Sequence, residues 1–307
     1  MDRRDLLKSA VMMGGAVLAG GKAIMAENTP PQTRFKLKYA IQSDWFMKLP
    51  AMEDWMQRIH DAGFRAVENN LVRTLQPDEL RRYAHKLEQL GLAHGIFLVN
   101  RGVDAGAGVV NSKEHVAFIE EVHATIETAK VLGNKHVTIT TGNELPGMTR
   151  GQMTANVIEG LKRGGELLAK AGLIGVVEPL NVKVNHPGYF CVYSDEAYAI
   201  MKAVDNPHIK ILFDIYHQQI SEGNLIDNIR RCWDEIGYFQ FADVPGRHEP
   251  WTGEINYRNV FKAIHDKQRE TGQDHFVGAE LTPQKGNTPE GMQALFEAIR
   301  RADDFEI

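Results

Sequence analysis

The feature that most constrains this chain is a repeated alternation between short apolar segments and longer amphipathic segments. The alternation occurs eight times between residues 36 and 301. Short apolar runs are typical of parallel strands covered on both faces, and helices between them supply the crossovers that parallel pairing requires. The pattern therefore predicts an α/β protein with a parallel sheet. The expected strands are KLKYAIQ (36–42), AVENN (66–70), LAHGIFLVN (92–100), KHVTITT (135–141), GVVEPL (175–180), IKILFD (209–214), GYFQFAD (237–243) and HFVGAE (275–280).

The segments between these strands end with residues that are typical of helix termini. Glycine follows four of them, at Gly63, Gly91, Gly133 and Gly172, where it can adopt the left-handed conformation that ends a helix. No GxGxxG or GxxxxGK[ST] nucleotide-binding motif follows the first strand. Eight units without an intervening linker favour a closed barrel over an open doubly wound sheet, so we predict one (β/α)8 TIM barrel over residues 35–307. The expected helices lie near residues 50–62, 77–90, 112–132, 150–171, 195–205, 224–235, 256–268 and 289–301.

Composition narrows the class of protein further. Hydrophobic residues make up 43% of the 307 residues, as in a globular domain large enough for one barrel. The formal net charge is −5, so the chain has no excess of basic residues for phosphate backbones, and we expect no nucleic-acid partner. Two cysteines, Cys191 and Cys232, are too few for a disulfide framework or a thiolate metal site, and we expect two buried thiols.

The first 26 residues have the features of an export signal. Arg3 and Arg4 precede a Gly/Ala-rich apolar run, and small residues then lead to a cleavage point at Ala26. The paired arginines indicate the bacterial twin-arginine route. The apolar run is shorter than the roughly 20 residues of a spanning helix, so we expect no stable membrane insertion after export. These features predict a signal peptide over 1–26, a linker over 27–34 and a periplasmic or extracytoplasmic barrel.

Each of the last four strands ends on a side chain that can bind a metal. Because the carboxyl ends of barrel strands converge on one mouth, we expect these side chains to lie together. Three carboxylates and one amide would form an all-oxygen cage, which favours Mg²⁺ or Mn²⁺ over a thiolate or multi-histidine zinc site. Three carboxylates without a cation would repel one another and take up protons. The expected ligands are Glu178, Asp214, Gln240 and Glu280.

Polar residues in the loops after these strands are candidates for binding a substrate. His217 follows Asp214 by three residues, so it lies where a side chain can reach over the mouth. His186 and Glu249 lie in the loops after strands five and seven. Arg247 has the planar fork that binds a carboxylate bidentately, although a surface salt bridge is an equal alternative for it. We expect His217, Arg247, His186 and Glu249 to contact a small sugar or keto-acid substrate.

These residues resemble the signatures of a known family. The segment PGRHEPWTGEINY (245–257) resembles the P-x-RHEP-x-x-GEINY signature of the hydroxypyruvate isomerase family, within the xylose-isomerase-like barrel superfamily. VEPLN around Glu178, FDIYHQQISEGNL around Asp214, FQFAD around Gln240 and GAE at Glu280 are also similar to that family. The similarity is strongest over residues 175–281. ELTP (280–283), VENNL (67–71) and LVNRGVDAG (98–106) depart from the family pattern.

The resemblance implies a metal-dependent isomerase. Glu178 and Glu280 would be the acid/base pair as well as metal ligands, and Asp214 and Gln240 would complete the site. His217 and Arg247 would contact the substrate. A proton would pass between adjacent carbons through an enediolate.

Three other activities stay open from the sequence. An epimerase or lyase acting on keto-sugars would use the same enolate chemistry. A non-catalytic sugar-binding protein on a barrel scaffold is possible because fold alone does not determine function. A DNA-repair nuclease of the same superfamily is less favoured, since the chain lacks the histidine-rich mouth and basic surface that this activity requires.

Overall fold

The strands join into one eight-stranded parallel sheet that curves until its edges meet. From one edge, the strand order is β3-β2-β1-β8-β7-β6-β5-β4. The computed structural model describes residues 35–43, 52–100 and 108–307, and the expected signal peptide and linker lie outside these ranges. The strands are β1 (Lys38–Gln42), β2 (Ala66–Glu68), β3 (Ala93–His94), β4 (His136–Ile139), β5 (Ile174–Val177), β6 (Ile209–Asp214), β7 (Ile236–Phe241) and β8 (Phe276–Ala279).

The barrel closes between its third and fourth strands through residues that follow β3. Leu98 forms a parallel bridge with Thr138. The Val99 N–H donates to the Thr138 carbonyl at 2.8 Å, and the Thr138 N–H donates to the Phe97 carbonyl at 2.9 Å. The predicted strand over 92–100 is therefore regular only at its start, although its later residues still complete the ring.

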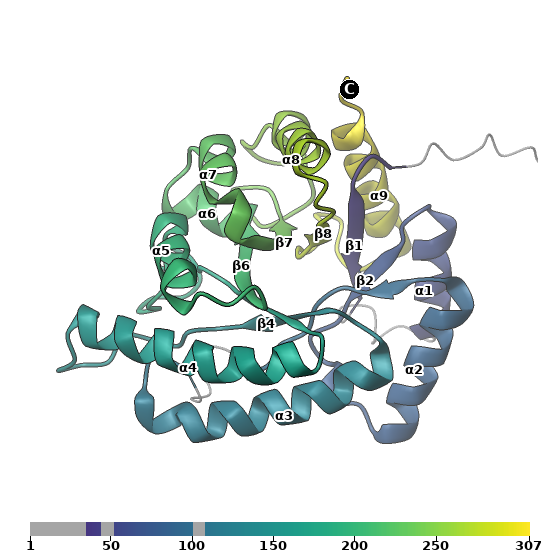
Figure 1. The fold of residues 1–307 in the computed structure, drawn as a ribbon. Helices are drawn as coiled ribbons and strands as arrows, with labels where there is room; N and C mark the ends of the chain where they lie inside the picture. Colours follow the sequence, from purple (N-terminus) through teal and green to yellow (C-terminus); the bar gives the residue numbers. More distant parts are fainter. Residues whose placement is uncertain (1–34, 44–51, 101–107) are drawn as a thin grey trace, which may run out of the picture. The chain divides into compact units, whose positions relative to one another are not determined.

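Helices surround the strands on the outside, as Figure 1 shows. The prediction of an α/β protein with a (β/α)8 barrel is confirmed. Gly63, Gly91, Gly133 and Gly172 all have positive φ, as expected for residues that end helices. The helices are α1 (Met52–Asp61), α2 (Pro77–Leu90), α3 (His115–Leu132), α4 (Arg150–Lys170), α5 (Ser194–Val204), α6 (Ile215–Ser221), α7 (Leu225–Cys232), α8 (Tyr257–Thr271) and α9 (Pro289–Asp303), with short 3-10 turns at Val72–Thr74, Ser112–Glu114 and Trp233–Glu235.

One helix was not predicted. The short helix α6 follows β6 directly, where the sequence indicated a loop. Seven residues are too few for a clear amphipathic period, and the segment is buried on most sides. His217 therefore projects from a helix rather than from a loop, which restricts its position.

Apolar side chains fill two layers of the fold. The larger core lies between the sheet and the helices, and includes fully buried Phe64, Phe118 and Phe213. A smaller cluster, formed by Ile96, Val176, Leu212 and Tyr238, lies apart from it. Burial of each such side chain contributes about 1.5–3 kcal/mol relative to exposure.

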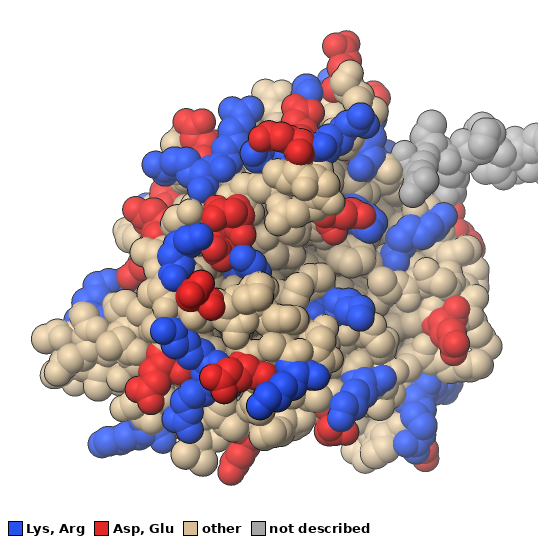
Figure 2. Space-filling model, in the orientation of Figure 1, with Lys and Arg blue, Asp and Glu red and all other residues tan. Residues whose placement is uncertain are grey.

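The described residues have charges of both signs on the face shown, no membrane-spanning helix and two buried thiols. Lys/Arg and Asp/Glu side chains are interspersed over the face seen in Figure 2. Within the described ranges, no helix has the length and apolar character needed to cross a bilayer. Cys191 and Cys232 are both free and buried, as expected.

Candidate active site

The ends of the last four strands place polar side chains around one cavity. Side chains two residues apart on a strand share a face. Each of these polar residues therefore points to the same side as the interior-facing residue two positions before it. Glu178 follows β5, Asp214 ends β6, Gln240 lies near the end of β7 and Glu280 follows β8. Those interior-facing residues are Val176, Leu212, Tyr238 and Gly278.

These side chains form a cluster that can hold a metal ion. Glu178, Asp214, His217 and Glu280 each offer a ligand atom, and these atoms lie within 4.8 Å of one another. Glu178 Oε1, Asp214 Oδ2 and Gln240 Oε1 are buried and accept no hydrogen bond from the described residues. Buried oxygens normally have a partner. Three such oxygens at one mouth supply part of the oxygen shell that a hard divalent cation takes, so the residues fit a metal site.

The carboxyl groups have unusual acidities in the metal-free protein. Burial raises the pKa of Glu178 well above its usual range, and the neighbouring Glu280 and Asp214 carboxylates raise it further. Burial raises the pKa of Asp214 to about 7, although the Arg247 guanidinium acts in the opposite direction. The cluster therefore holds protons near neutral pH that a bound cation would displace.

Asp214 also caps the helix that follows it. Its Oδ1 accepts hydrogen bonds from the backbone N–H groups of Tyr216 at 2.7 Å and His217 at 3.4 Å. This arrangement is an N-cap of α6, and it leaves Oδ2 directed toward the cluster. One oxygen of Asp214 thus caps a helix, and the other faces the candidate metal site.

His217 is a hydrogen-bond donor toward the cavity rather than a metal ligand. Its Nδ1 accepts from the Asn181 backbone N–H at 3.2 Å, so the proton of the neutral ring is on Nε2. Burial and the Arg247 charge lower the pKa of His217, which keeps the ring neutral. Nε2 lies 3.9 Å from Glu178 Oε1 and 3.7 Å from Asp214 Oδ2, too far for direct hydrogen bonds. Neither carboxylate therefore engages the Nε2–H.

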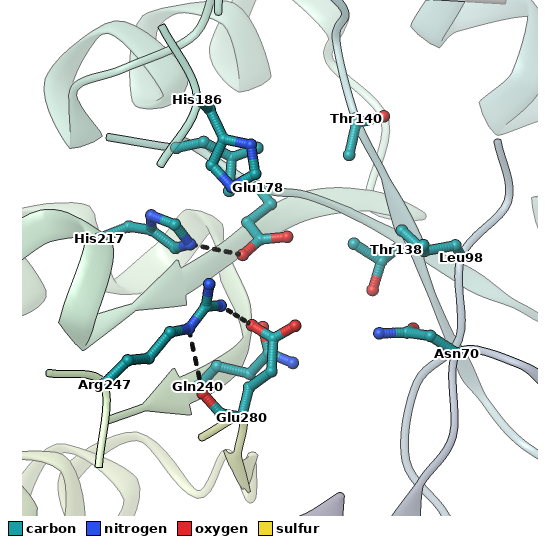
Figure 3. Close-up of a pocket in the computed structure, with 11 residues that line it drawn as sticks. Asn70, Leu98, Thr138, Thr140, Glu178, His186, His217, Gln240, Arg247 and Glu280 are labelled. Atoms are coloured by element: carbon teal, nitrogen blue, oxygen red, sulfur yellow. Dashed lines mark hydrogen bonds and ion pairs between the residues drawn. The ribbon is translucent and has the colours of Figure 1, made fainter. Parts of the chain in front are cut away.

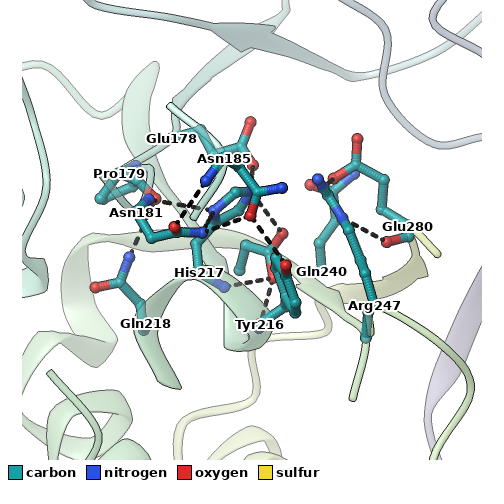
Figure 4. Close-up of polar contacts among 12 residues, drawn as sticks. Glu178, Pro179, Asn181, Asn185, Tyr216, His217, Gln218, Gln240, Arg247 and Glu280 are labelled. Carbon is teal, nitrogen blue, oxygen red and sulfur yellow. Dashed lines mark hydrogen bonds and ion pairs between the residues drawn. The ribbon is translucent and has the colours of Figure 1, made fainter. Parts of the chain in front are cut away.

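The Asn181 side chain reinforces this tautomer. Asn181 Oδ1 accepts from the backbone N–H groups of Val184 and Asn185, which assigns the amide orientation. Its Nδ2 then donates to His217 Nδ1 at 2.7 Å and to Asn185 Oδ1 at 3.0 Å, and the Tyr216 hydroxyl donates to the same Asn185 oxygen at 2.9 Å (Figure 4). The ring orientation and the position of its proton are thus determined together.

Arg247 lies inside the site and is bound to one of the two glutamates. Its Nη2 donates to Glu280 Oε2 at 2.6 Å, and its Nε donates to the Glu280 carbonyl at 3.4 Å. The guanidinium also lies 4.9 Å from the centre of the Tyr216 ring. The alternative of a surface salt bridge is excluded, because the residue lines the cavity. Glu280 engages the Nε–Nη2 edge of the fork, which leaves the Nη1–Nη2 edge to donate to a second carboxylate.

The loop that carries Arg247 is organised by a buried aspartate. Asp243 accepts hydrogen bonds from the backbone N–H groups of Val244, Trp251, Gly253 and Ile255 at 2.9–3.1 Å. Arg247 itself has φ of 56°, a left-handed conformation that arginine rarely adopts. Such strain persists where surrounding contacts over-determine it, and it is frequent at functional sites.

The cavity has a volume of about 150 Å³. This is below the roughly 300–1,000 Å³ of sites for drug-sized ligands, and it suits a small substrate. Figure 3 shows the side chains of Glu178 and Glu280 in this space between His217 and Arg247 on one side and Asn70 on the other. The described lining residues are Asn70, Leu98, Thr138, Thr140, Glu178, Leu180, His186, His217, Gln240, Arg247 and Glu280.

Two of the predicted substrate-binding residues differ in where they lie relative to the cavity. His186 lines the cavity, and its ring centre lies 5.4 Å from that of His217. Glu249 does not line the described cavity. Its buried carboxylate accepts a hydrogen bond from the Gln284 backbone N–H at 2.8 Å, so it ties two mouth loops together. Contact of Glu249 with a substrate stays a prediction, and the structure assigns this carboxylate a contact between loops.

Sequence reasoning missed three residues that support the site. Glu68 ends β2, so the rule applied to the last four strands would have identified it. Asn181 and Asp243 lie three residues after Glu178 and Gln240, next to predicted ligands, and showed no separate signal. Glu68 and Asn181 depend on partners that only the closed barrel brings near, whereas Asp243 binds N–H groups of its own loop.

Comparison with known proteins identifies the family. The family model for xylose isomerase-like TIM barrels matches residues 56–301. The chain belongs to the xylose isomerase-like TIM barrel family.

Several members with assigned names are similar to this chain over most of its length. A Danio rerio protein named as a candidate hydroxypyruvate isomerase is 33% identical over 270 residues, covering 84% of this chain and 94% of the relative. Hydroxypyruvate isomerase of Escherichia coli K12 is 32% identical, covering 75% and 89%. The 2-oxo-tetronate isomerase of Cupriavidus necator is 31% identical, covering 74% and 85%.

A solved structure of this barrel family is also similar. The AP endonuclease, family 2 structure from Brucella melitensis has a TM-score of 0.71 and 29% identity, covering 83% of this chain and 96% of that one. The similarity extends through the strands that carry the candidate site, because the matched region is nearly the whole barrel.

Proposed function

We propose that this barrel is a metal-dependent isomerase of small hydroxy-keto acids or sugars, similar to hydroxypyruvate isomerase. The observation that carries the proposal is the group of three unpartnered buried oxygens, from Glu178, Asp214 and Gln240, beside Glu280. The expected ion is Mg²⁺ or Mn²⁺, because all the available ligand atoms are hard oxygens once His217 is assigned as a donor.

The ligands are also the groups that can move a proton. A divalent ion bound by Glu178, Asp214, Gln240 and Glu280 would act as a Lewis acid on the substrate carbonyl. One of the two glutamates removes a proton from the carbon beside the carbonyl, and an enediolate results. The other returns a proton to the former carbonyl carbon. One C–H bond is broken and one is formed, while the hydroxyl proton passes to the former carbonyl oxygen.

Two further residues would hold the substrate during this transfer. His217 donates its Nε2–H to a substrate oxygen, where it stabilises developing negative charge. Arg247 provides a positive charge beside the same space, which suits an acid substrate. The small cavity favours a substrate of a few carbon atoms.

The test is a substrate panel in D₂O with Mn²⁺ or Mg²⁺, followed by proton NMR. The panel contains hydroxypyruvate, a 2-oxo-tetronate, a ketohexose and a 3-keto-glycoside. Isomerisation of a small keto acid with solvent deuterium incorporated at carbon is the expected result. Inversion of one stereocentre would indicate an epimerase, and loss of a leaving group would indicate a lyase. Binding without any exchange, and no bound divalent ion, would indicate a sugar-binding protein instead.

We also propose that the barrel is exported by the twin-arginine route, on the basis of Arg3 and Arg4 and the segment after them. The test is a fusion of residues 1–34 to a reporter that folds in the cytoplasm. Export that is lost when both arginines are replaced by lysine is the expected result. Reporter retained in the cytoplasm with the native segment would refute this location.

A further inference from the structure

A buried carboxylate outside the proposed metal ligands contacts one of them. Glu68 ends β2 and is 2% exposed. Its Oε2 accepts a hydrogen bond from Gln240 Nε2 at 3.0 Å, and its Oε1 accepts one from the Tyr238 hydroxyl at 2.6 Å. The second distance is typical of a hydroxyl bonded to an ionised carboxylate. Tyr238 and Gln240 lie two residues apart on β7, so both project from the same face toward Glu68.

The fold leaves space for this carboxylate. Gly278 of β8 pairs in register with Gln240, and a Cβ at position 278 would overlap Glu68 Oε1. A Cβ at Gly95 would similarly overlap the Tyr238 hydroxyl. Side chains at either position would displace the Glu68–Tyr238 pair, so a glycine of β8 and a glycine just after β3 make room for one contact.

The contact has a chemical consequence for Gln240. An amide has one oxygen that can bind a cation and one NH₂ that cannot. An ionised carboxylate only accepts, so Glu68 selects the orientation in which the Gln240 NH₂ faces it. The Gln240 oxygen is then directed away, where it is buried and has no partner among the described residues.

We propose that Glu68 is a positioning residue that orients the Gln240 amide so that its oxygen, and not its nitrogen, faces the divalent ion. This inference rests on the proposed metal site. Outer groups of this kind typically change metal affinity by about 10–100-fold when they are altered.

The central variant is Glu68→Gln, which keeps the shape but can donate as well as accept. The Gln240 amide is then free to reverse and present its NH₂ to the ion. We expect Mn²⁺ binding measured by calorimetry to weaken by about 10–100-fold. The double variant Glu68→Gln with Gln240→Glu should recover most of that loss, because residue 240 then has an oxygen in either orientation.

A matched control tests the loss of a buried carboxylate elsewhere in the barrel. Glu235 is 8% exposed, contacts Lys202 and Lys210, and lies just before β7, at the opposite end of the strand from Gln240. Glu235→Gln should leave Mn²⁺ affinity within about twofold of the wild type, because it contacts no proposed ligand.

The outcomes separate this inference from the function on which it rests. Wild-type protein that binds no divalent ion would overturn the metal site and this inference with it. Wild-type binding with unchanged affinity in Glu68→Gln would overturn the inference alone. A loss that the double variant does not recover would assign the effect to packing and would also overturn it. If Glu68→Gln does not fold, a crystal structure of the Mn²⁺-loaded wild type decides, and Gln240 turned away from the ion would refute the proposal.

Discussion

Asp214 and His217 are related by one hydrogen bond and by one close approach of their side chains. The Asp214 Oδ1 accepts the His217 backbone N–H at 3.4 Å, and the Asp214 Oδ2 lies 3.7 Å from His217 Nε2. The first contact starts α6 and determines where the histidine projects. The second places its N–H beside a proposed metal ligand. Because the two residues are three positions apart, Asp214 can cap the helix and also lie beside the His217 ring.

The two oxygens of Asp214 can be separated by mutation. Asp214→Asn retains a good N-cap, so the metal-free protein should keep its stability, while an NH₂ group replaces Oδ2. We expect Mn²⁺ affinity to fall by at least about 100-fold, measured by calorimetry. Asp214→Ala should lose the same affinity and also about 0.5–2 kcal/mol of stability through the missing cap. An asparagine variant that binds Mn²⁺ like the wild type would remove Asp214 from the ligand set.

The proposed acid/base pair, Glu178 and Glu280, can be tested with isosteric amides. Glu280→Gln and Glu178→Gln each remove a proton-transfer group, so kcat/KM should fall by about 10²–10⁴-fold or more. Thermal unfolding should show an intact fold, and residual Mn²⁺ binding should be measured in parallel because both residues are also proposed ligands. Unchanged turnover in either variant would exclude that glutamate from the mechanism.

Metal binding should depend on pH. Burial raises the pKa of Asp214 to about 7 from its ordinary 3.8, so the folded metal-free protein holds a proton that the unfolded chain releases. The stability from this group is therefore fully present below about pH 4 and is lost as pH rises through 7. A cation must displace the protons that Asp214 and Glu178 hold, so Mn²⁺ affinity should rise by at least about tenfold per pH unit below 7.

The check for this prediction is thermal unfolding with and without Mn²⁺. The increase in Tm caused by the ion should be larger at pH 8 than at pH 5.5. Equal increases at both values, with proton release absent in calorimetry, would contradict the assignment of a protonated cluster.

The tautomer of His217 is open to a direct test. Asn181→Asp replaces the shorter, side-chain donor to Nδ1 with an acceptor, which competes with the backbone N–H that remains and favours a proton on Nδ1 over the Nε2–H that faces the cavity. We expect kcat/KM to fall by about 10–100-fold, with a changed ¹⁵N signal of the ring. Asn185→Ala is the control, because Asn185 contacts Asn181 but not the ring in the described contacts, and its effect should be much smaller. A ring signal unchanged in Asn181→Asp would refute this role.

The periodicity of the chain by itself determined the fold and the end of the barrel at which the site lies. Apolar strands and amphipathic helices alternate because each must bury one face, and the last interior position of a strand must then lie at the mouth. Glu178, Asp214, Gln240 and Glu280 could therefore be predicted from where strands end.

The tertiary structure alone decided which side chains meet there, and which tautomer or amide orientation they adopt. Glu68 and Gln240 are 172 residues apart, and Asn181 and His217 are 36 apart, so no local pattern links them. Closure of the barrel brings these pairs within hydrogen-bond distance, and a short-range directional contact then determines which atom of an amide or imidazole faces the cavity. The fold likewise joins the Glu249 carboxylate to the Gln284 backbone N–H, 35 residues away in another loop, which no local pattern links.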